Sequence, residues 1–144
     1  MRHEGTLELT WTNKRLRLLA HEDDTYEWVE PADYRVAEVR LLHDHSTVGG
    51  TGKDRARDNL LIRGDALHAL RSLTQLPEFS RQIAGKVRLC YIDPPFNTGA
   101  AFAQYDDGLD HSIWLTMMRD RLLQVRLLLA PEGSVWVHCD DYEQ

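Results

Sequence analysis

The chain has 144 residues, a length that fits about one domain, and its content of 42% hydrophobic and 28% charged residues is typical of a globular protein. Its formal net charge of -6 argues against a surface that grips nucleic-acid phosphates over its whole extent, because such binding depends on Lys and Arg. Apolar runs such as Leu127–Ala130 are too short for a membrane helix, and the first residues do not resemble a signal peptide, so we expect a cytoplasmic protein without membrane association.

The first 58 residues are mixed in character. Aromatic residues stand among charges in "LELTWTNKRL" and "YEWVEPADYRVAEVRLL" without sustained periodicity, which favours short strands and turns packed on a larger body. Residues 43–58 are rich in glycine and charge and are predicted to form a flexible linker. We therefore predict an N-terminal extension at residues 1–58, followed by a second part at residues 59–144.

Two features of this linker look like ligand sites, and we reject both. Gly52 and Lys53 suggest a phosphate-binding loop, but Asp54 stands where that loop requires Ser or Thr. His43 and His45 lie close together, yet such residues in a loop are usually solvated. We predict no metal site.

A regular pattern begins at residue 59. "NLLIRGD" predicts a short buried strand that ends at Gly64 and Asp65, and "ALHALRSL" predicts a helix that Asp65 caps. "KVRLCYI", residues 86–92, predicts a second strand, which Pro94 and Pro95 interrupt at once.

The remainder predicts a long helix and a third strand. "SIWLTMMRDRLLQVRLLL" is helical in pattern, with Ser112 as a candidate cap and with Pro131 and Gly133 as its stop. "SVWVHCDD" then predicts the strand. One face of the predicted helix carries Trp114, Met118, Leu122, Val125 and Leu129.

The two cysteines are predicted to be reduced, buried thiols. Cys90 and Cys139 each lie in an apolar, strand-like run, and they do not have CxxC spacing. Neither a zinc site nor a disulfide framework is indicated.

Strands that alternate with helices predict an α/β fold with parallel β-α-β units. In open sheets of this kind ligands bind outside the carboxyl ends of the strands. Here those ends carry Asp65, the segment 93–96, and the pair Asp140 and Asp141. We expect the three acidic endings to lie on one edge of the sheet.

The sequence Asp93-Pro94-Pro95-Phe96 is suited to hold an amino group of a nucleobase. Each proline fixes its own φ, restricts the residue before it and removes an N–H donor, so the segment forms a stiff ledge of acceptors. Two acceptors that bind both hydrogens of an exocyclic amine would free its lone pair for attack. Phe96 could stack on a base swung out of the duplex. The same four residues are also compatible with a simple turn.

The wider segment resembles amino-group DNA methyltransferases. "IDPPFNTG" is similar to their catalytic Asp-Pro-Pro-Tyr or Asp-Pro-Pro-Phe motif, and "NLLIRGDALHALRSL" and "WLTMMRDRLLQVRLLLAPEGSVWVHCDDYE" resemble the segments around it. "LELTWTNKRLRLL", "YEWVEP" and "AEVRLL" resemble the start of the modification (Mod) subunits of type III restriction-modification systems. This resemblance implies a partial Rossmann-like, S-adenosylmethionine-dependent methyltransferase sheet of mostly parallel strands with flanking helices.

The resemblance also implies roles for individual residues. The catalytic residues would be Asp93, Pro94, Pro95 and Phe96. Asp65 would contact the adenosyl part of S-adenosylmethionine, and the cofactor-binding residues would be Asp65, Ala66 and Asp93. The substrate-binding residues would be Phe96, Asn97 and Thr98.

An Asp at the first motif position favours adenine N6 over cytosine N4, which stays open as an alternative. In the permuted class that the chain resembles, the glycine-rich cofactor loop and the target-recognition region follow the catalytic motif. Neither is found here, so residues 59–144 would be the N-terminal portion of an incomplete catalytic domain, inactive alone. The expected partners are double-stranded DNA, the missing C-terminal half or a restriction subunit, and a second copy in a homodimer. A non-catalytic module that pairs with a second polypeptide is the alternative from another class.

Overall fold

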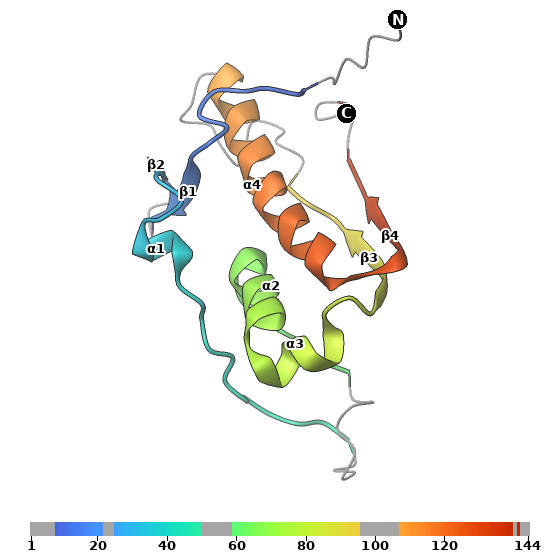
Figure 1. Cartoon of the computed structure of the whole chain (residues 1–144). Helices are drawn as coiled ribbons and strands as arrows, with labels where there is room; N and C mark the ends of the chain where they lie inside the picture. Colours follow the sequence, from blue (N-terminus) through green and yellow to red (C-terminus); the bar gives the residue numbers. More distant parts are fainter. Residues whose placement is uncertain (1–7, 22–24, 50–58, 96–106, 140, 142–144) are drawn as a thin grey trace, which may run out of the picture.

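The computed structural model describes residues 8–21, 25–49, 59–95, 107–139 and 141 (Figure 1). These residues form two small sheets and four helices. The second sheet consists of two parallel strands, which a long helix connects. In chain order the elements are β1 (Arg17–Ala20), β2 (Tyr26–Val29), α1 (Tyr34–Ala37), α2 (Ala66–Gln75), α3 (Pro77–Ile83), β3 (Val87–Ile92), α4 (Asp107–Leu128) and β4 (Leu129–Val137).

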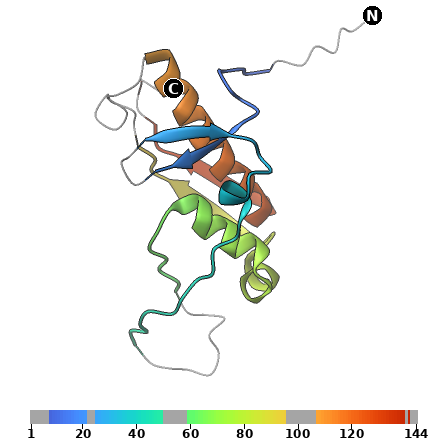
Figure 2. The same ribbon diagram turned by 90° about the vertical axis from the view of Figure 1, so that its left-hand side faces the viewer.

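Helix α4 lies between the two sheets, as Figures 1 and 2 show from two directions. Its residues Ile113, Trp114 and Met118 form a buried cluster. Partly buried residues pack on this cluster from both sides, and they include Leu18 of β1 and Ile92 of β3. Neither α4 nor any other helix of the described residues is both long and apolar enough to cross a bilayer.

The predicted apolar face of α4 is confirmed at four of its five positions. Trp114, Met118 and Val125 are buried and Leu122 is partly buried, whereas Leu129 is the first residue of β4. The predicted ends are wrong. The helix begins at Asp107, so Ser112 lies inside it rather than at its cap.

At its other end α4 runs directly into β4 at Leu129. Pro131 and Gly133 therefore lie within β4 and do not form a separate stop. They are tolerated there because the register jumps from the pair Val87–Leu129 to the pair Leu89–Ser134, which leaves the residues between them without a ladder partner.

Strands β3 and β4 pair in parallel, as the predicted β-α-β unit requires. The α/β class is therefore confirmed at the level of a two-stranded parallel sheet with adjacent helices. Tyr91 and Trp136 are partners in the register and are 62% and 64% exposed, so they lie together on the face turned away from α4.

The strand predicted at residues 59–64 is wrong. These residues are not a strand in the structure, and Leu61 is 96% exposed. A strand needs a neighbour for its ladder of hydrogen bonds, and within the described part of the chain β3 and β4 pair with each other alone. An apolar sequence does not supply that neighbour.

Helix α2 begins as predicted. The Oδ1 atom of Asp65 accepts hydrogen bonds from the backbone N–H groups of Leu67 and His68, at 2.9 and 3.2 Å. This carboxylate is therefore the N-cap of the helix. Helix α3 was not predicted, although Pro77 at its first position is a typical helix start.

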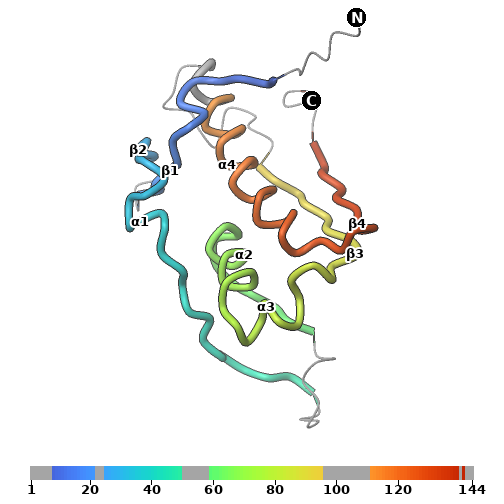
Figure 3. Tube along the Cα trace, viewed as in Figure 1, coloured from blue at the N-terminus to red at the C-terminus, as the bar shows by residue number. Residues whose placement is uncertain are grey.

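The N-terminal part contains a short antiparallel hairpin that packs on α4, together with turns, as the sequence predicted, and the short helix α1, which was not predicted. The indole Nε1–H of Trp11 donates to the hydroxyl of Thr116 at 2.8 Å, and the Arg119 side chain donates to the carbonyls of Lys14 and Leu16. The chain then passes alongside α2 as an irregular trace (Figure 3), where the Ser72 hydroxyl donates to the Arg40 carbonyl. Residues 50–58 of the predicted linker lie outside the described residues.

The prediction of two buried thiols is wrong for Cys139 and met only in part by Cys90. Cys90 in β3 is half-buried, and its desolvation raises the pKa of the thiol. Cys139 is exposed, because β4 ends at Val137 and leaves Cys139 beyond the strand.

Gly133 lies where a side chain does not fit. A Cβ at this position would stand 2.7 Å from the carbonyl oxygen of Val87 and 3.0 Å from that of Ala130. We expect Gly133→Ala to lower the free energy of unfolding by about 1–3 kcal/mol, because backbone rather than a flexible side chain must move. Urea unfolding measures this loss, and Gly85→Ala is unsuitable as a control because Gly85 has a φ of +70°. An unchanged denaturation midpoint would contradict the close contact with Val87.

Candidate active site

The predicted ledge begins where β3 ends. Asp93, Pro94 and Pro95 directly follow Ile92, the last residue of the strand. Asp93 and Pro95 are exposed and Pro94 is buried, so the carboxylate faces solvent beside a packed ring. Three further predicted site residues, Phe96, Asn97 and Thr98, lie outside the described residues.

A tryptophan of α4 holds the end of this ledge. The indole Nε1–H of Trp114 donates to the carbonyl oxygen of Pro95 at 2.6 Å. Trp114 is 5% exposed and belongs to the buried cluster of α4. The sequence predicted Trp114 as a core residue, and its link to the ledge was missed.

A histidine at the end of β4 faces the acid of the ledge. The Nδ1 atom of His138 lies 3.2 Å from Oδ1 of Asp93, and the backbone N–H of His138 donates to the carbonyl of Ile92 at 2.9 Å. The two parallel strands therefore end at the same edge. The prediction that three acidic strand ends share this edge is wrong for Asp65, which follows no strand, and Asp140 lies outside the described residues. Sequence reasoning missed His138, although it follows β4 as Asp93 follows β3. Both side chains are more than half exposed, so this pair contributes little to stability.

Asp65 is linked to the same helix as the ledge. Its Oδ1 caps α2, and its Oδ2 lies 2.6 Å from Nη2 of Arg121, which was not predicted as part of the site. Arg121 and Trp114 are seven residues apart on α4, which corresponds to roughly 10 Å along the helix axis. Helix α4 is thus a common support for Asp65 and for the ledge. Ala66 is exposed at the first turn of α2.

A hollow of about 290 Å³ lies beside Asp65. Its apolar lining includes Leu41 and Ile62, and Asp65 and His68 are among its polar residues. The Nδ1 atom of His68 is buried and has no hydrogen-bond partner within the part of the chain that the structure describes. The hollow is close to the lower limit for ligand pockets, about 300 Å³, and therefore suits part of a cofactor rather than all of it.

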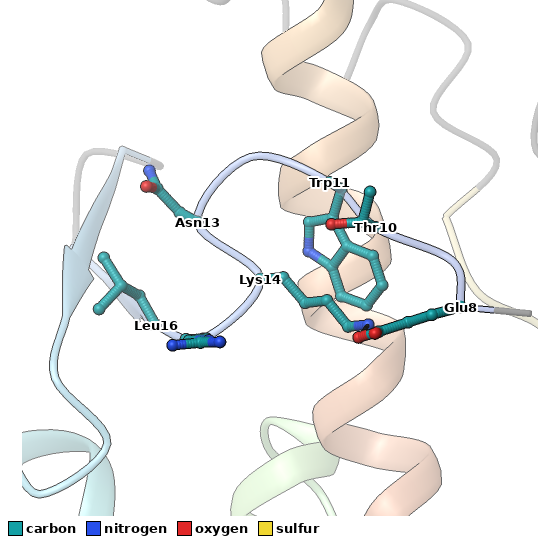
Figure 4. A pocket seen from close by; sticks show the side chains of 7 residues that line it. Glu8, Thr10, Trp11, Asn13, Lys14 and Leu16 are labelled. Carbon is teal, nitrogen blue, oxygen red and sulfur yellow. Dashed lines mark hydrogen bonds and ion pairs between the residues drawn. The ribbon is translucent and has the colours of Figure 1, made fainter. Parts of the chain in front are cut away.

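A larger hollow, of about 620 Å³, opens at the N-terminal segment (Figure 4). Lys14 spans it, with Nζ 2.6 Å from a carboxylate oxygen of Glu8 and 5.2 Å from the centre of the Trp11 ring. Its lining residues are Glu8, Thr10, Trp11, Asn13, Lys14, Arg15 and Leu16. None of them belongs to the ledge or to α2, and we assign no reaction to this hollow.

Comparison with known proteins gives matches to a DNA methylase family, to type III Mod subunits and to a type II methyltransferase. Residues 87–144 match a family described as DNA methylase. The probable type III restriction-modification enzyme HindVI Mod subunit of Haemophilus influenzae is 48% identical over 87 residues, which cover 60% of this chain and 11% of that protein. The type III EcoPI Mod subunit of Escherichia phage P1 is 29% identical over 133 residues, 72% of this chain and 20% of that protein.

A shorter match is to the type II methyltransferase M.EcaI of Enterobacter cloacae, 39% identical over 59 residues, 37% of this chain and 13% of that protein. No solved structure matches. The chain thus spans between about a tenth and a fifth of the length of these relatives. The predicted resemblance to amino-group DNA methyltransferases, and to Mod subunits among them, is confirmed.

Proposed function

We propose that this chain, a relative of DNA methylases and of type III Mod subunits, carries the catalytic ledge and part of the cofactor pocket of an adenine-N6 DNA methyltransferase. Asp93, Pro94 and Pro95 at the carboxyl end of β3 are the observation that supports this proposal most directly. In this proposal residues 59–144 are part of a Rossmann-like catalytic domain, and residues 1–58 are an extension packed on it.

The ledge would activate the amino group of a base. The Asp93 carboxylate and the Pro94 carbonyl would accept its two hydrogens and so turn the nitrogen lone pair out of conjugation with the ring. As the new N–C bond forms, the methyl carbon would leave the sulfonium sulfur of the cofactor, which would keep the electron pair of the broken C–S bond. The nitrogen would lose one proton, and the Asp93 carboxylate would accept it. Phe96 would stack on the flipped base, with Asn97 and Thr98 beside it.

The hollow beside Asp65 would hold the adenosyl part of S-adenosylmethionine. Its aliphatic residues suit the flat face of a purine, and the buried Nδ1 of His68 and the Asp65 carboxylate offer polar partners. Ala66, at the start of α2, would lie next to this group. The cofactor supplies an electrophilic methyl group when bound, and the rest of its pocket would come from a glycine-rich loop of another segment.

The proposed substrate is double-stranded DNA in the cytoplasm. Because the chain is acidic, we assign most of the contacts with DNA phosphates to a separate, basic segment, either the remainder of the enzyme or a partner such as a restriction subunit. A homodimer with a second copy is a further proposed assembly.

Methyl transfer tests the proposal. The 144-residue chain, and a chimera in which it replaces the matching segment of the HindVI Mod subunit, are incubated with mixed-sequence DNA and methyl-labelled S-adenosylmethionine. We expect the chimera to form N6-methyladenine, identified by nucleoside analysis. Formation of N4-methylcytosine would overturn the choice of base. A folded chimera without transfer, beside an active parent enzyme, would overturn the proposed function.

Two substitutions of Asp65 separate its role as a helix cap from its proposed role as a cofactor ligand. Asn caps a helix about as well as Asp, so Asp65→Asn keeps the cap but places an N–H₂ group where Oδ2 stands. We expect roughly tenfold to 100-fold weaker binding of S-adenosylmethionine by calorimetry, with little change in stability. Asp65→Ala, the comparison variant, additionally loses about 1 kcal/mol of stability. Unchanged cofactor affinity in Asp65→Asn would remove Asp65 from the pocket.

A further inference from the structure

We infer that Trp114 is a positioning residue for the ledge. Its indole N–H fixes the Pro95 carbonyl and thereby sets the direction in which Asp93 and Pro94 present their acceptors. This inference rests on the proposed function for its catalytic consequence, but the positioning itself is testable without it.

Trp114 is a rigid anchor. It is 5% exposed, and its neighbours Ile113 and Met118 are 1% and 4% exposed. Ile92, the last residue of β3, packs against the same cluster. The buried cluster that includes Trp114 therefore contacts the chain just before the ledge, and the Trp114 indole hydrogen-bonds the chain just after Asp93 and Pro94. A displacement of the ledge relative to α4 would have to disturb the core.

The ledge is unusually dependent on such an anchor. Pro94 and Pro95 have no N–H groups, so the segment must be fixed through its carbonyl oxygens. The indole N–H of a tryptophan can only donate a hydrogen bond, so it is suited to bind a carbonyl oxygen of this segment. Because Trp114 binds the Pro95 carbonyl, the acceptors that we assign to the base amine are the Asp93 carboxylate and the Pro94 carbonyl.

The ledge is held at both ends. At its start, the backbone N–H of His138 donates to the carbonyl of Ile92 at 2.9 Å. At its finish, Trp114 donates to Pro95 at 2.6 Å. Between these two bonds the φ angles of both prolines are fixed by their rings. The orientation of the Asp93 backbone is therefore determined by β4 on one side and by α4 on the other.

Trp114→Phe tests the inference, with Trp11→Phe as the matched control. Both changes remove one indole hydrogen bond to or from α4, but Trp11 donates to Thr116 and not to the ledge. Carbon-13 NMR of the full chain follows the Asp93 carboxyl carbon and the Pro95 carbonyl carbon. We expect both resonances to shift in Trp114→Phe and to stay in place in Trp11→Phe. If Trp114→Phe lowers the melting temperature but leaves both resonances in place, Trp114 only contributes to packing and does not position the ledge.

Kinetics of the chimera described above give the second measurement. We expect Trp114→Phe to lower kcat roughly tenfold to 100-fold with little change in the KM for S-adenosylmethionine, because a small misplacement of a catalytic group has such an effect. Trp11→Phe should keep the parent kcat. Equal kcat in both variants would overturn the inference. If the unsubstituted chimera transfers no methyl group while Trp114→Phe still shifts the ledge resonances, the proposed function fails and the positioning role stands.

Discussion

Asp93→Ala is expected to lower kcat for methyl transfer by roughly 10²- to 10³-fold in the active chimera, the effect typical of losing one group that stabilises the transition state. The substitution removes the acceptor that would bind the target amine and take up its proton. Stability should change little, because the Asp93 side chain is 61% exposed and its contact with His138 is a surface ion pair. Transfer rates are measured with saturating DNA and cofactor.

Asp93→Asn is the matched comparison for this prediction. The amide keeps the size of the side chain and one carbonyl acceptor but cannot accept the proton. We expect its rate to fall between those of the parent and of Asp93→Ala. If Asp93→Ala retains the parent rate, the ledge is a turn after a strand and the active site lies elsewhere.

Asp120→Ala is expected to have the largest effect on stability, a loss of about 3 kcal/mol, the lower end for removing one partner of a buried ion pair. The Asp120 side chain is 4% exposed, and its Oδ1 lies 2.5 Å from Nη1 of Arg17 and 2.7 Å from Nη2 of Arg119. Nε of Arg119 donates a hydrogen bond to Oδ1 of Asp120 at 2.8 Å, whereas Nη1 of Arg17 has no hydrogen-bond partner among the described residues, so we treat the Arg17 contact as an ion pair. The lower end applies because both arginines keep about a fifth or more of their side chains exposed.

A double-mutant cycle isolates the Asp120 interaction. Urea unfolding is measured for Asp120→Ala, Arg17→Met and the pair of substitutions together. We expect the pair to lose less stability than the two single changes summed, because Arg17→Met removes one of the cations left without a carboxylate. Additive losses would mean that Arg17 and Asp120 do not interact.

Local patterns in the sequence predicted much of the structure of residues 59–144. The apolar, β-favouring run before Pro94 identified β3, the helical spacing identified the buried face of α4, and the position of Asp65 identified the cap of α2. Each of these features depends on residues within a few positions of one another. The stiffness of the segment at Pro94 and Pro95 is a local property as well, which is why the ledge could be recognised without a structure.

The features that were missed depend on distant residues. The contact of Trp114 with Pro95 joins positions 19 apart, and that of Arg121 with Asp65 joins positions 56 apart. No spacing rule relates such pairs before the fold is known. The strand wrongly predicted at residues 59–64 also depends on a distant partner. Its apolar residues would fit a sheet, but a strand forms only beside a neighbouring strand, which its own sequence does not supply.

The direct passage from α4 into β4 has a consequence for how the protein melts. Leu128 ends the helix and Leu129 begins the strand, so the element that carries Trp114 and the element that carries His138 to Asp93 form one continuous stretch of backbone. Native-state hydrogen exchange should therefore find β3, β4 and the central turns of α4 opening with a single free energy, as one cooperative unit. Denaturant should abolish the ledge and the core at the same concentration, without a folded intermediate that has lost its site.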